Sequence, residues 1–348
     1  MVTAKQVAEQ LGIAVSTVGR AMADDPRISA ETKAKVRKMA EQLGYVGNTA
    51  ARVMRGGSSK LIGLLLPDVT NDFYATIAQA LSECCDAEGY RLILSIHNDD
   101  REVEFRHIKE LAAARVAGVI TVPTAAPRRD SINLLRSLPH AQLLRNVPAL
   151  NPICFGIDDE VALREATAHL LALGHRRIAY IGGQDIRSTG ASRLAGFHRA
   201  FADMGIDRGQ AIEMLGEPTR TFGVQATSEL LRGRKKPTAI VMGSIHATLG
   251  MLEVLSEQRI AVPDDLSVVG FGDPLWFAWW GAGLTTVRPP IQELATTCGL
   301  WFLHHLKNLG KESTGSSHKA VSSSSLVVRG STAAIAVSPA KGRAKARA

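Results

Sequence analysis

The chain has 348 residues, of which 45% are hydrophobic and 21% are charged, and its formal net charge is +8. This length exceeds one ordinary hydrophobic core and predicts two or three domains. No apolar run approaches the length of a membrane span, and the amphipathic N-terminus is unlike a secretory signal peptide. The four cysteines show no metal-ligand spacing, which indicates reduced thiols in a cytoplasmic protein and no metal site.

The first stretch, residues 3–22, predicts two short helices joined by a tight turn. Thr3 can cap the first helix, with Gln6 at the position of a capping box, and Gly12 can end it. The second helix begins at Val15. A helix–turn–helix of this kind lays its second helix in the major groove of DNA. On spacing alone, an ordinary helical hairpin in a globular domain stays open as the alternative.

A third helix, 30–43, follows a cap at Ser29 and completes a predicted headpiece over residues 1–46. Residues 47–60 predict a hinge, made of a short basic helix over 49–55 and then a flexible Gly/Ser joint. Up to the end of this hinge the chain holds ten Lys and Arg residues against five Asp and Glu residues. Such an excess beside a helix–turn–helix indicates contacts with phosphates.

From residue 61 onward, apolar runs of strand length alternate with amphipathic helices. This alternation predicts an α/β core of two doubly wound lobes over residues 61–332. The second series of strands and helices starts near Cys154. Ligands of such sheets bind at the carboxyl ends of the strands, so the cleft between the two lobes is the expected site.

The end of the chain predicts three further segments and a tail. Strands at 284–287 and 326–332 flank a helix from about 290 to 309. The last segment, 333–348, carries four basic residues and no acidic ones. We interpret it as a disordered, solubilising tail rather than as a second DNA contact.

Several separate motifs occur in one order along the chain. They include VTAKQVAEQLGIAVSTVGRAM near the start, LGHRRIAYIGG and VPDDLSVVGFGD in the core, and LTTVRPP and LVVRGST near the end. In this order they resemble the LacI/GalR family of bacterial transcriptional repressors, over about residues 2–332. The resemblance implies an all-α helix–turn–helix headpiece, a hinge helix and a two-lobed α/β core like that of periplasmic sugar-binding proteins.

The resemblance also implies how the protein works. Members are usually homodimers that bind double-stranded operator DNA, and their affinity changes when a small molecule, here a sugar or sugar derivative, enters the cleft. It implies no cofactor, no membrane partner, and a cytoplasmic, nucleoid-associated location. We therefore expect a sequence-specific repressor and not an enzyme. A ligand-sensing activator of the same fold, or a sugar-binding protein with weak DNA affinity, is the alternative.

Position by position, the resemblance assigns the DNA contacts to eight residues: Thr3, Val15, Ser16, Thr17, Arg20, Asn48, Met54 and Arg55. Arg20 is a natural donor to guanine or to phosphate. Met54 stands where the family places an apolar wedge between base steps, and an ordinary buried helix residue is the alternative. Ala14 replaces the usual capping Ser of the reading helix, and Gly47 replaces the usual Pro before the hinge. We expect these departures to lower operator affinity.

The resemblance places the effector site at nine residues of the core: Asn71, Phe73, Tyr74, Arg187, Thr189, Arg193, Phe222, Asp273 and Trp276. The aromatic members could stack on the apolar face of a sugar ring or a purine. Trp276 belongs to an aromatic loop, DPLWFAWWG. We expect Trp276 to face the ligand, and Trp279 and Trp280 to pack the lobes.

The charge of the predicted site differs from the family pattern. Places where relatives often carry an acidic residue hold Gly272, Ile245, and Leu144 or Arg145, depending on the register. The two arginines of the predicted site remain. Carboxylates suit neutral sugars because they accept hydrogen bonds from hydroxyl groups. A site that lacks these carboxylates and keeps two guanidinium groups favours a sugar acid or sugar phosphate over a neutral sugar. The alternative is that Asp273 replaces the missing acid and the ligand is a neutral sugar.

The sequence contains no recognisable catalytic set. A dehydrogenase would need a Gly-rich turn that opens a helix, and the only candidate, at Gly182 and Gly183, lacks the third glycine. His175 is interpreted as a structural residue at a helix-to-strand turn. A free periplasmic sugar-binding protein would share the core, but it would need a signal peptide and no headpiece.

Overall fold

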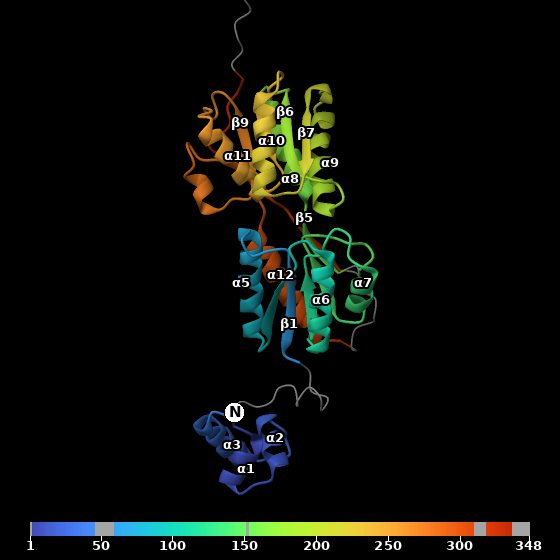
Figure 1. The fold of residues 1–348 in the computed structure, drawn as a ribbon, viewed down its shortest axis with the longest axis vertical. Helices are drawn as coiled ribbons and strands as arrows, with labels where there is room; N and C mark the ends of the chain where they lie inside the picture. The colour runs from blue at the N-terminus through green and yellow to red at the C-terminus, as the bar shows by residue number, and fades with distance from the viewer. Residues whose placement is uncertain (1, 46–58, 151–152, 310–317, 336–348) are drawn as a thin grey trace, which may run out of the picture. The chain divides into compact units, whose positions relative to one another are not determined.

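The computed structural model describes residues 2–45, 59–150, 153–309 and 318–335. The chain divides into two compact units, residues 1–60 and 61–348, which are described separately (Figure 1). The predicted hinge helix and its residues Asn48, Met54 and Arg55 lie outside the described residues, so these assignments stay predictions. No helix in the described ranges is long and apolar enough to cross a bilayer.

The first unit is a three-helix headpiece, with α1 at Ala4–Leu11, α2 at Val15–Met22 and α3 at Ala30–Leu43. The helix ends are local: Thr3 forms a capping box with Gln6, and Gly12 ends α1 with a φ of 62°. The Ser29 side chain caps α3 by accepting from the Thr32 N–H. The core is small and contains the buried side chains of Val7, Ala8, Val18, Ala21 and Val36.

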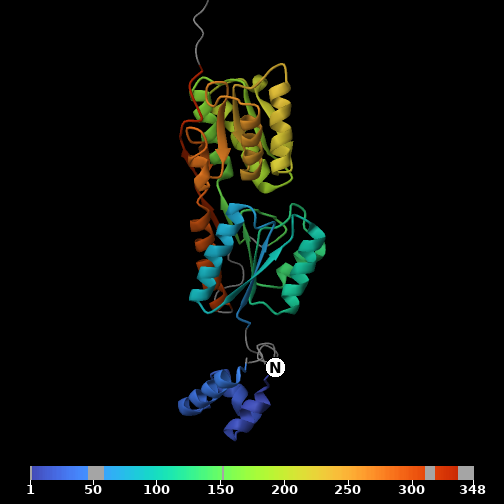
Figure 2. The same ribbon diagram turned by 60° about the vertical axis from the view of Figure 1, so that its left-hand side comes forward.

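The first lobe of the second unit is a six-stranded parallel sheet with the order β11-β5-β4-β3-β1-β2. Helices α5 and α12 cover one face, and α6 and α7 cover the other (Figure 2). The strands are β1 Leu61–Leu66, β2 Arg91–Ile96, β3 Gly118–Thr121, β4 His140–Leu143, β5 Cys154–Ile157 and β11 Lys319–Ser322. The helices are α5 Asp72–Ala87, α6 Arg101–Ala113, α7 Arg129–Arg136 and α12 Ile291–Lys307.

The second lobe is also six-stranded, with the order β12-β10-β9-β8-β6-β7, and β12 runs antiparallel to β10. In this lobe α8 packs against α9, and α10 packs against α11. The strands are β6 Ile178–Gly183, β7 Ile212–Gly216, β8 Ala239–Met242, β9 Ser267–Phe271, β10 Thr285–Arg288 and β12 Ser325–Val327. The helices are α8 Asp159–Ala172, α9 Ser188–Asp203, α10 Arg220–Arg232 and α11 Ile245–Glu257, with short 3₁₀ turns η1 Arg208–Gln210 and η2 Leu275–Ala278.

The described chain passes between the two lobes after β5, after β10 and after β11. Two sequence expectations were therefore wrong. The second lobe does not start near Cys154, because β5 pairs with β4 in the first sheet. Strand β11 was not predicted, and the strand expected over 326–332 is only Ser325–Val327. Short parallel strands take their partners from distant segments, which local periodicity does not show.

The final described residues, 333–335, belong to the core although the sequence assigned them to the tail. The N–H of Ile335 donates to the Leu173 carbonyl at 3.0 Å. The His175 ring lies 3.0 Å from the Ala333 carbonyl and 3.0 Å from the Thr238 hydroxyl. His175 is thus a structural residue, as predicted, and it holds the end of the second lobe. Residues 336–348 lie outside the described ranges.

Candidate DNA-reading helix and effector pocket

The outer face of α2 carries the predicted base-reading residues. Val15 is 48% exposed, and Ser16 and Arg20 are also exposed. The inner face of the same helix is closed by Val18 and Ala21, which are buried against the other helices. This division leaves one face of a short helix, with apolar Val15 and polar Ser16 and Arg20, open to a partner.

The N-termini of α1 and α2 bear on two further predictions, the missing cap at Ala14 and the role of Thr3. Ala14 precedes α2 and makes no side-chain cap, as expected from its lack of a hydroxyl group. Thr3 is exposed, and its backbone N–H donates to Gln6 Oε1 at 2.8 Å. Its hydroxyl group accepts from the Gln6 N–H and so helps to start α1. Any contact of Thr3 with DNA would be a second role of this residue.

A cavity of about 330 Å³ lies at the carboxyl ends of the strands in both lobes of the core. This is the position that the fold class predicts for a ligand. Its first-lobe lining comes from the segments that follow β1, β2 and β4, and includes Asp68, Asn71, Phe73, Tyr74, Asn98, Asp99, Leu144 and Arg145. Its second-lobe lining follows β6, β7 and β8, and includes Arg187, Thr189, Arg193, Glu217, Thr219, Ser244 and His246.

Six of the nine predicted effector-site residues line this cavity: Asn71, Phe73, Tyr74, Arg187, Thr189 and Arg193. The Asn71 side chain also caps α5 by accepting from the Phe73 N–H at 3.0 Å. The Phe73 ring lies 6.1 Å from the ring of Phe271, which lines the cavity from the second lobe. The two aromatic rings form an apolar wall among polar groups.

Asp273 and Phe222, in contrast, do not line this cavity. The Asp273 side chain is 3% exposed and is held in ion pairs by Arg288 and Arg329. Its carboxylate also accepts from the Thr286 hydroxyl at 2.9 Å, so it has no free acceptor for a sugar. The Phe222 ring covers Gly216 at the end of β7, where an added Cβ would lie 2.4 Å from the ring.

The aromatic loop also differs from the expectation. Trp276 does not line the cavity; it is 38% exposed on η2 and packs edge-on against Phe277. Trp279 was expected to pack the lobes but is 71% exposed, whereas Trp280 packs against the core of the second lobe. The 3₁₀ turn buries Phe277 and leaves Leu275 and Trp276 exposed, a division that the composition of the loop does not reveal.

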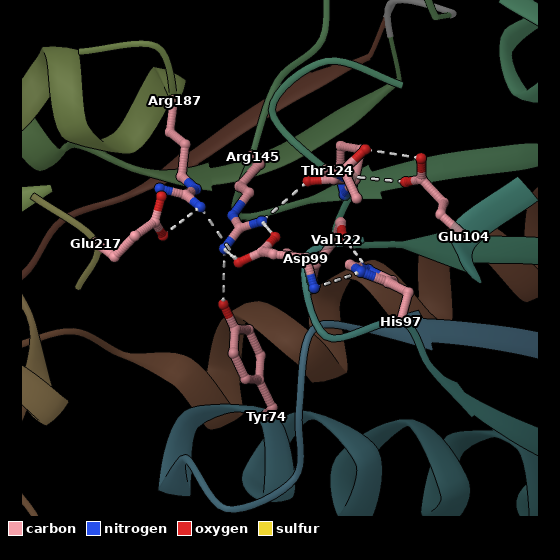
Figure 3. Close-up of polar contacts among 10 residues, drawn as sticks. Tyr74, His97, Asp99, Glu104, Val122, Thr124, Arg145, Arg187 and Glu217 are labelled. Carbon is pink, nitrogen blue, oxygen red and sulfur yellow. Dashed lines mark hydrogen bonds and ion pairs between the residues drawn. The ribbon is translucent and has the colours of Figure 1, made fainter. Parts of the chain in front are cut away.

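The centre of the pocket is an acidic side chain held between two arginines (Figure 3). Arg145 Nη2 donates to Asp99 Oδ2 at 3.1 Å, and Arg145 Nη1 pairs with Asp99 Oδ1. Arg145 also donates to the Pro123 carbonyl at 3.1 Å and contacts the Tyr74 hydroxyl at 3.5 Å. Burial acts to raise the pKa of Asp99, but hydrogen bonds and charge from Arg145, with the charge of Arg187, hold this pKa below its usual range.

Arg187 enters from the second lobe, immediately before α9. Its Nη2 donates to Glu217 Oε2 at 2.8 Å and lies 3.7 Å from Asp99 Oδ2. The residue is 7% exposed, and its Nε and Nη1 atoms are buried without a hydrogen-bond partner among the described residues. Unpaired buried donors are costly, so this guanidinium group is suited to an added acceptor.

Arg193 already has an acidic partner at the edge of the pocket. Its Nε donates to Asp159 Oδ1 at 2.7 Å, and its Nη1 donates to the Gly243 carbonyl at 2.7 Å. The guanidinium group also stacks 3.9 Å from the centroid of the Phe271 ring. Burial raises the pKa of Asp159, although the charge of Arg193 opposes this. Arg193 therefore presents a neutralised surface rather than a free cation.

A second layer of polar side chains supports the segments behind Asp99. The Asp99 N–H donates to His97 Nδ1 at 3.2 Å, and His97 Nε2 lies 3.0 Å from the Val122 carbonyl. Burial lowers the pKa of His97, which favours the neutral ring with the proton on Nε2. The buried Glu104 carboxylate accepts from the backbone and hydroxyl of Thr124 at 2.9 and 2.8 Å, which orders the loop after β3.

The sequence argument about missing acids was incomplete, because Asp68, Asp99 and Glu217 line the pocket. Leu144 and Arg145 both line the pocket, so either register puts a pocket residue at the place of the missing acid. Asp99 lies three residues after the end of strand β2. The segment IHNDD lies at the carboxyl end of a strand, which is the signal in the sequence that points to Asp99. The described residues contain no group of three or more potential metal ligands.

Two family models and several known proteins match this chain. The family model for bacterial regulatory proteins of the lacI family matches residues 3–48, and that for a periplasmic binding protein-like domain matches residues 167–332. The HTH-type transcriptional regulator GalR of Salmonella typhimurium is 30% identical over 297 residues, or 85% of this chain and 87% of the relative. Catabolite control protein A of Priestia megaterium is 27% identical over 84% of this chain and 89% of its own.

Solved structures agree with this relationship. The Lac repressor dimer bound to operator and the anti-inducer ONPF matches with a TM-score of 0.80 and 27% identity, covering 96% of this chain and 99% of that one. The transcriptional regulator CelR in its complex with cellobiose matches with a TM-score of 0.70 and 25% identity, covering 95% of this chain and 100% of that one. Headpiece, core and pocket together lead to one conclusion: the chain belongs to the LacI family of bacterial transcriptional regulators.

Proposed function

We propose that the protein is a homodimeric repressor that binds a near-palindromic operator and responds to a sugar-like effector in the cavity between the lobes. One observation carries this proposal: a polar cavity at the strand carboxyl ends occurs in the same chain as a headpiece whose α2 face is exposed. The Lac repressor relative is a dimer bound to operator, and the CelR relative is bound to cellobiose. The proposed place of action is the cytoplasm, on the nucleoid.

Two-fold symmetry is proposed because one headpiece offers few contacts. A single three-helix module reads a short half-site, and a dimer doubles the contacts and places two α2 helices in successive major grooves. Exposed apolar side chains outside the pocket support association, since Leu275 and Trp279 on and beside η2 are each 71% exposed. Arg20, Val15 and Ser16 are the proposed base-reading residues.

The proposed effector is a sugar acid. The support is Arg187, whose buried Nε and Nη1 atoms lack partners while it lines the cavity. A carboxylate would supply acceptors in the geometry that a guanidinium group prefers. The carboxylates of Asp68 and Glu217 also line the cavity and can accept from sugar hydroxyl groups. The Phe73 ring would cover the apolar face of the ligand.

Calorimetric titration tests the effector. We expect the full-length protein to bind gluconate or a related sugar acid more tightly than glucose, and Arg187→Gln to remove most of that preference. Arg176→Gln is the control, because it removes the same charge from an arginine that donates to the Leu171 and His175 carbonyls and does not line the cavity. Tight binding of a neutral sugar that survives Arg187→Ala, with no response to acidic analogues, would overturn the sugar-acid proposal.

Operator binding tests the regulatory role. Selection from a random DNA library should return a near-palindromic site, and fluorescence anisotropy should show that a sugar acid changes affinity for it. A reporter gene behind this site should be expressed less when the protein is present. Increased expression would indicate the activator alternative, and weak binding without sequence preference would indicate a sugar-binding protein that has lost its operator.

A further inference from the structure

The carboxylate of Asp99 lies between one arginine of each lobe (Figure 3). On its own lobe, it forms a two-point ion pair with Arg145. Towards the second lobe, its Oδ2 atom lies 3.7 Å from Arg187 Nη2. A second cross-lobe contact lies nearby, where the Asn146 N–H donates to the Ser188 hydroxyl at 3.0 Å. The two lobes thus meet through a charge pair in the middle of the pocket.

The two sides of this bridge differ in strength. Arg145 is 8% exposed and is fixed by the Pro123 carbonyl and the Tyr74 hydroxyl. The Asp99 backbone is fixed by His97, so the carboxylate is anchored to the first lobe. The contact with Arg187 is longer and involves one nitrogen atom, which also serves Glu217. The bridge should therefore break on the Arg187 side, with Asp99 staying on Arg145.

The proposed sugar acid carries the same chemical group, a carboxylate, that Asp99 already places beside Arg187. Asp99 supplies Arg187 with a carboxylate, which is also the group that a sugar acid would bring. Glu217 competes only weakly with a ligand for Arg187, because the Glu217 side chain is 58% exposed and can turn to water. Asp99 is 26% exposed and cannot leave the pocket without losing Arg145.

We propose that Asp99 is an internal counter-ion that joins the two lobes, and that an anionic effector acts by replacing it at Nη2 of Arg187. This inference rests on the effector pocket of the proposed function. It makes Asp99 a determinant of ligand charge: an anion that bonds to Nη2 of Arg187 ends a contact between the lobes, whereas a neutral sugar, or an anion held by Nε and Nη1 alone, leaves that contact in place. A ligand that breaks a cross-lobe contact has a different affinity for linked and unlinked lobes, which is what control of operator binding requires.

A distance measurement in the full-length protein tests the bridge without any ligand. Spin labels would be placed on cysteines introduced at Lys109 in α6 and Gln225 in α10, both exposed, because the four native cysteines are buried. In linked molecules the contact between Asp99 and Arg187 holds the two lobes together, and in unlinked molecules this contact is broken. We expect Asp99→Asn and Arg187→Gln each to change the ratio of linked to unlinked molecules by about fivefold, the effect of one partly exposed ion pair. The double variant should show no further change, because both substitutions remove the same contact.

Asp68→Asn is the matched control. Asp68 lines the same pocket, but among the described residues its carboxylate bonds within the first lobe, to the Thr70 hydroxyl and the Asn71 N–H. It removes the same charge and should leave the inter-lobe distances unchanged. Unchanged distances in both bridge variants, or additive effects in the double variant, would overturn the proposal. Arg187→Gln keeps the test valid if Asp99→Asn fails to fold.

Titration with gluconate and glucose separates this inference from the proposed effector. Asp99→Asn should bind gluconate about fivefold more tightly than the wild type, because the internal competitor is gone, and should bind glucose with unchanged affinity. Weaker gluconate binding by Asp99→Asn would refute the role as competitor. If the wild type binds neither probe, the sugar-acid proposal fails, and the distance measurement still decides whether Asp99 joins the lobes.

Discussion

Replacing Asp273 with alanine would remove a carboxylate that joins three polar side chains of the second lobe. Asp273 follows β9, Arg288 ends β10 where the chain passes to the first lobe, and Arg329 follows β12. The carboxylate accepts from Arg329 through both terminal nitrogens, at 2.8 and 2.9 Å. Asp273 therefore ties together two of the segments from which the chain enters or leaves the second lobe.

The expected cost follows from burial. The side chain of Asp273 is 3% exposed and that of Arg329 is 18% exposed, whereas Arg288 is 52% exposed. Removing one partner of a buried ion pair costs about 3–5 kcal/mol, and an exposed contact such as that with Arg288 adds at most about 1 kcal/mol. Arg329 keeps its bond to the Leu284 carbonyl at 2.6 Å, so we expect a loss of about 3 kcal/mol. For a unit of this size that loss lowers Tm by roughly 6 °C.

The effect should also depend on pH. Burial acts to raise the pKa of Asp273, but hydrogen bonds from Arg329, Arg288 and Thr286 hold this pKa below its usual range. A carboxyl group with a depressed pKa stabilises the fold at pH values above its unfolded pKa of about 3.9, and this contribution is lost as the pH falls through the folded pKa. The stability difference between wild type and Asp273→Ala should be constant above about pH 5 and shrink below about pH 4.

Thermal and urea unfolding followed by circular dichroism would measure the loss, and calorimetry would measure the affinity of the effector. Affinity should be unchanged, because Asp273 does not line the pocket. Asp203→Asn is the control: the Arg199–Asp203 pair is at least 40% exposed on both sides and should contribute less than about 1 kcal/mol. A stable Asp273→Ala variant with weakened effector binding would refute this reasoning and return Asp273 to the binding site.

Three further predictions concern the headpiece, the hinge and the packing of helices. Arg20→Ala should relax the sequence preference at one base of each half-site at a cost of about 1–3 kcal/mol, measured by anisotropy on matched and mutated operators; uniform weakening on all DNA would instead indicate a phosphate contact. Met54→Ala should lose specific operator affinity and keep non-specific binding, and unchanged operator affinity would exclude the wedge. Gly196→Ala should destabilise the core by at least about 2 kcal/mol in urea unfolding, because the added Cβ would lie 2.1 Å from the Glu160 carbonyl oxygen between α9 and α8. Gly156→Ala is the control, since its Cβ would meet nothing closer than 4.0 Å, and equal losses in both variants would contradict the packing argument.

The headpiece was predictable in detail because its determinants are local. The capping box at Thr3, the left-handed Gly12 and the cap at Ser29 each join residues within about one helical turn. The exposed face of α2 follows from helical periodicity alone. The alternation of strands and helices likewise predicted two α/β lobes and the pocket at the strand carboxyl ends.

The contents of the pocket were only partly predictable. Arg187 and Arg193 were found by resemblance, and both line it. Arg193 is paired with Asp159, whereas two buried nitrogens of Arg187 have no partner among the described residues. This difference depends on side chains that come from different helices and lobes. Asp273 seemed available for a ligand because its sequence neighbours resemble a binding loop. Its partner Arg329 lies 56 residues away, beyond the reach of any local pattern.

The sequence by itself determined the family, the order of the domains, the helix ends and the exposed face of α2, since these depend on contacts a few residues apart. Only the tertiary structure decided that β5 and β11 pair with each other in the first lobe, that Asp99 lies between Arg145 and Arg187, and that Asp273 is consumed in a buried ion pair. These features join segments 15 to 165 residues apart. Their free energies come from burial and pairing across the folded chain, which spacing along the sequence does not encode.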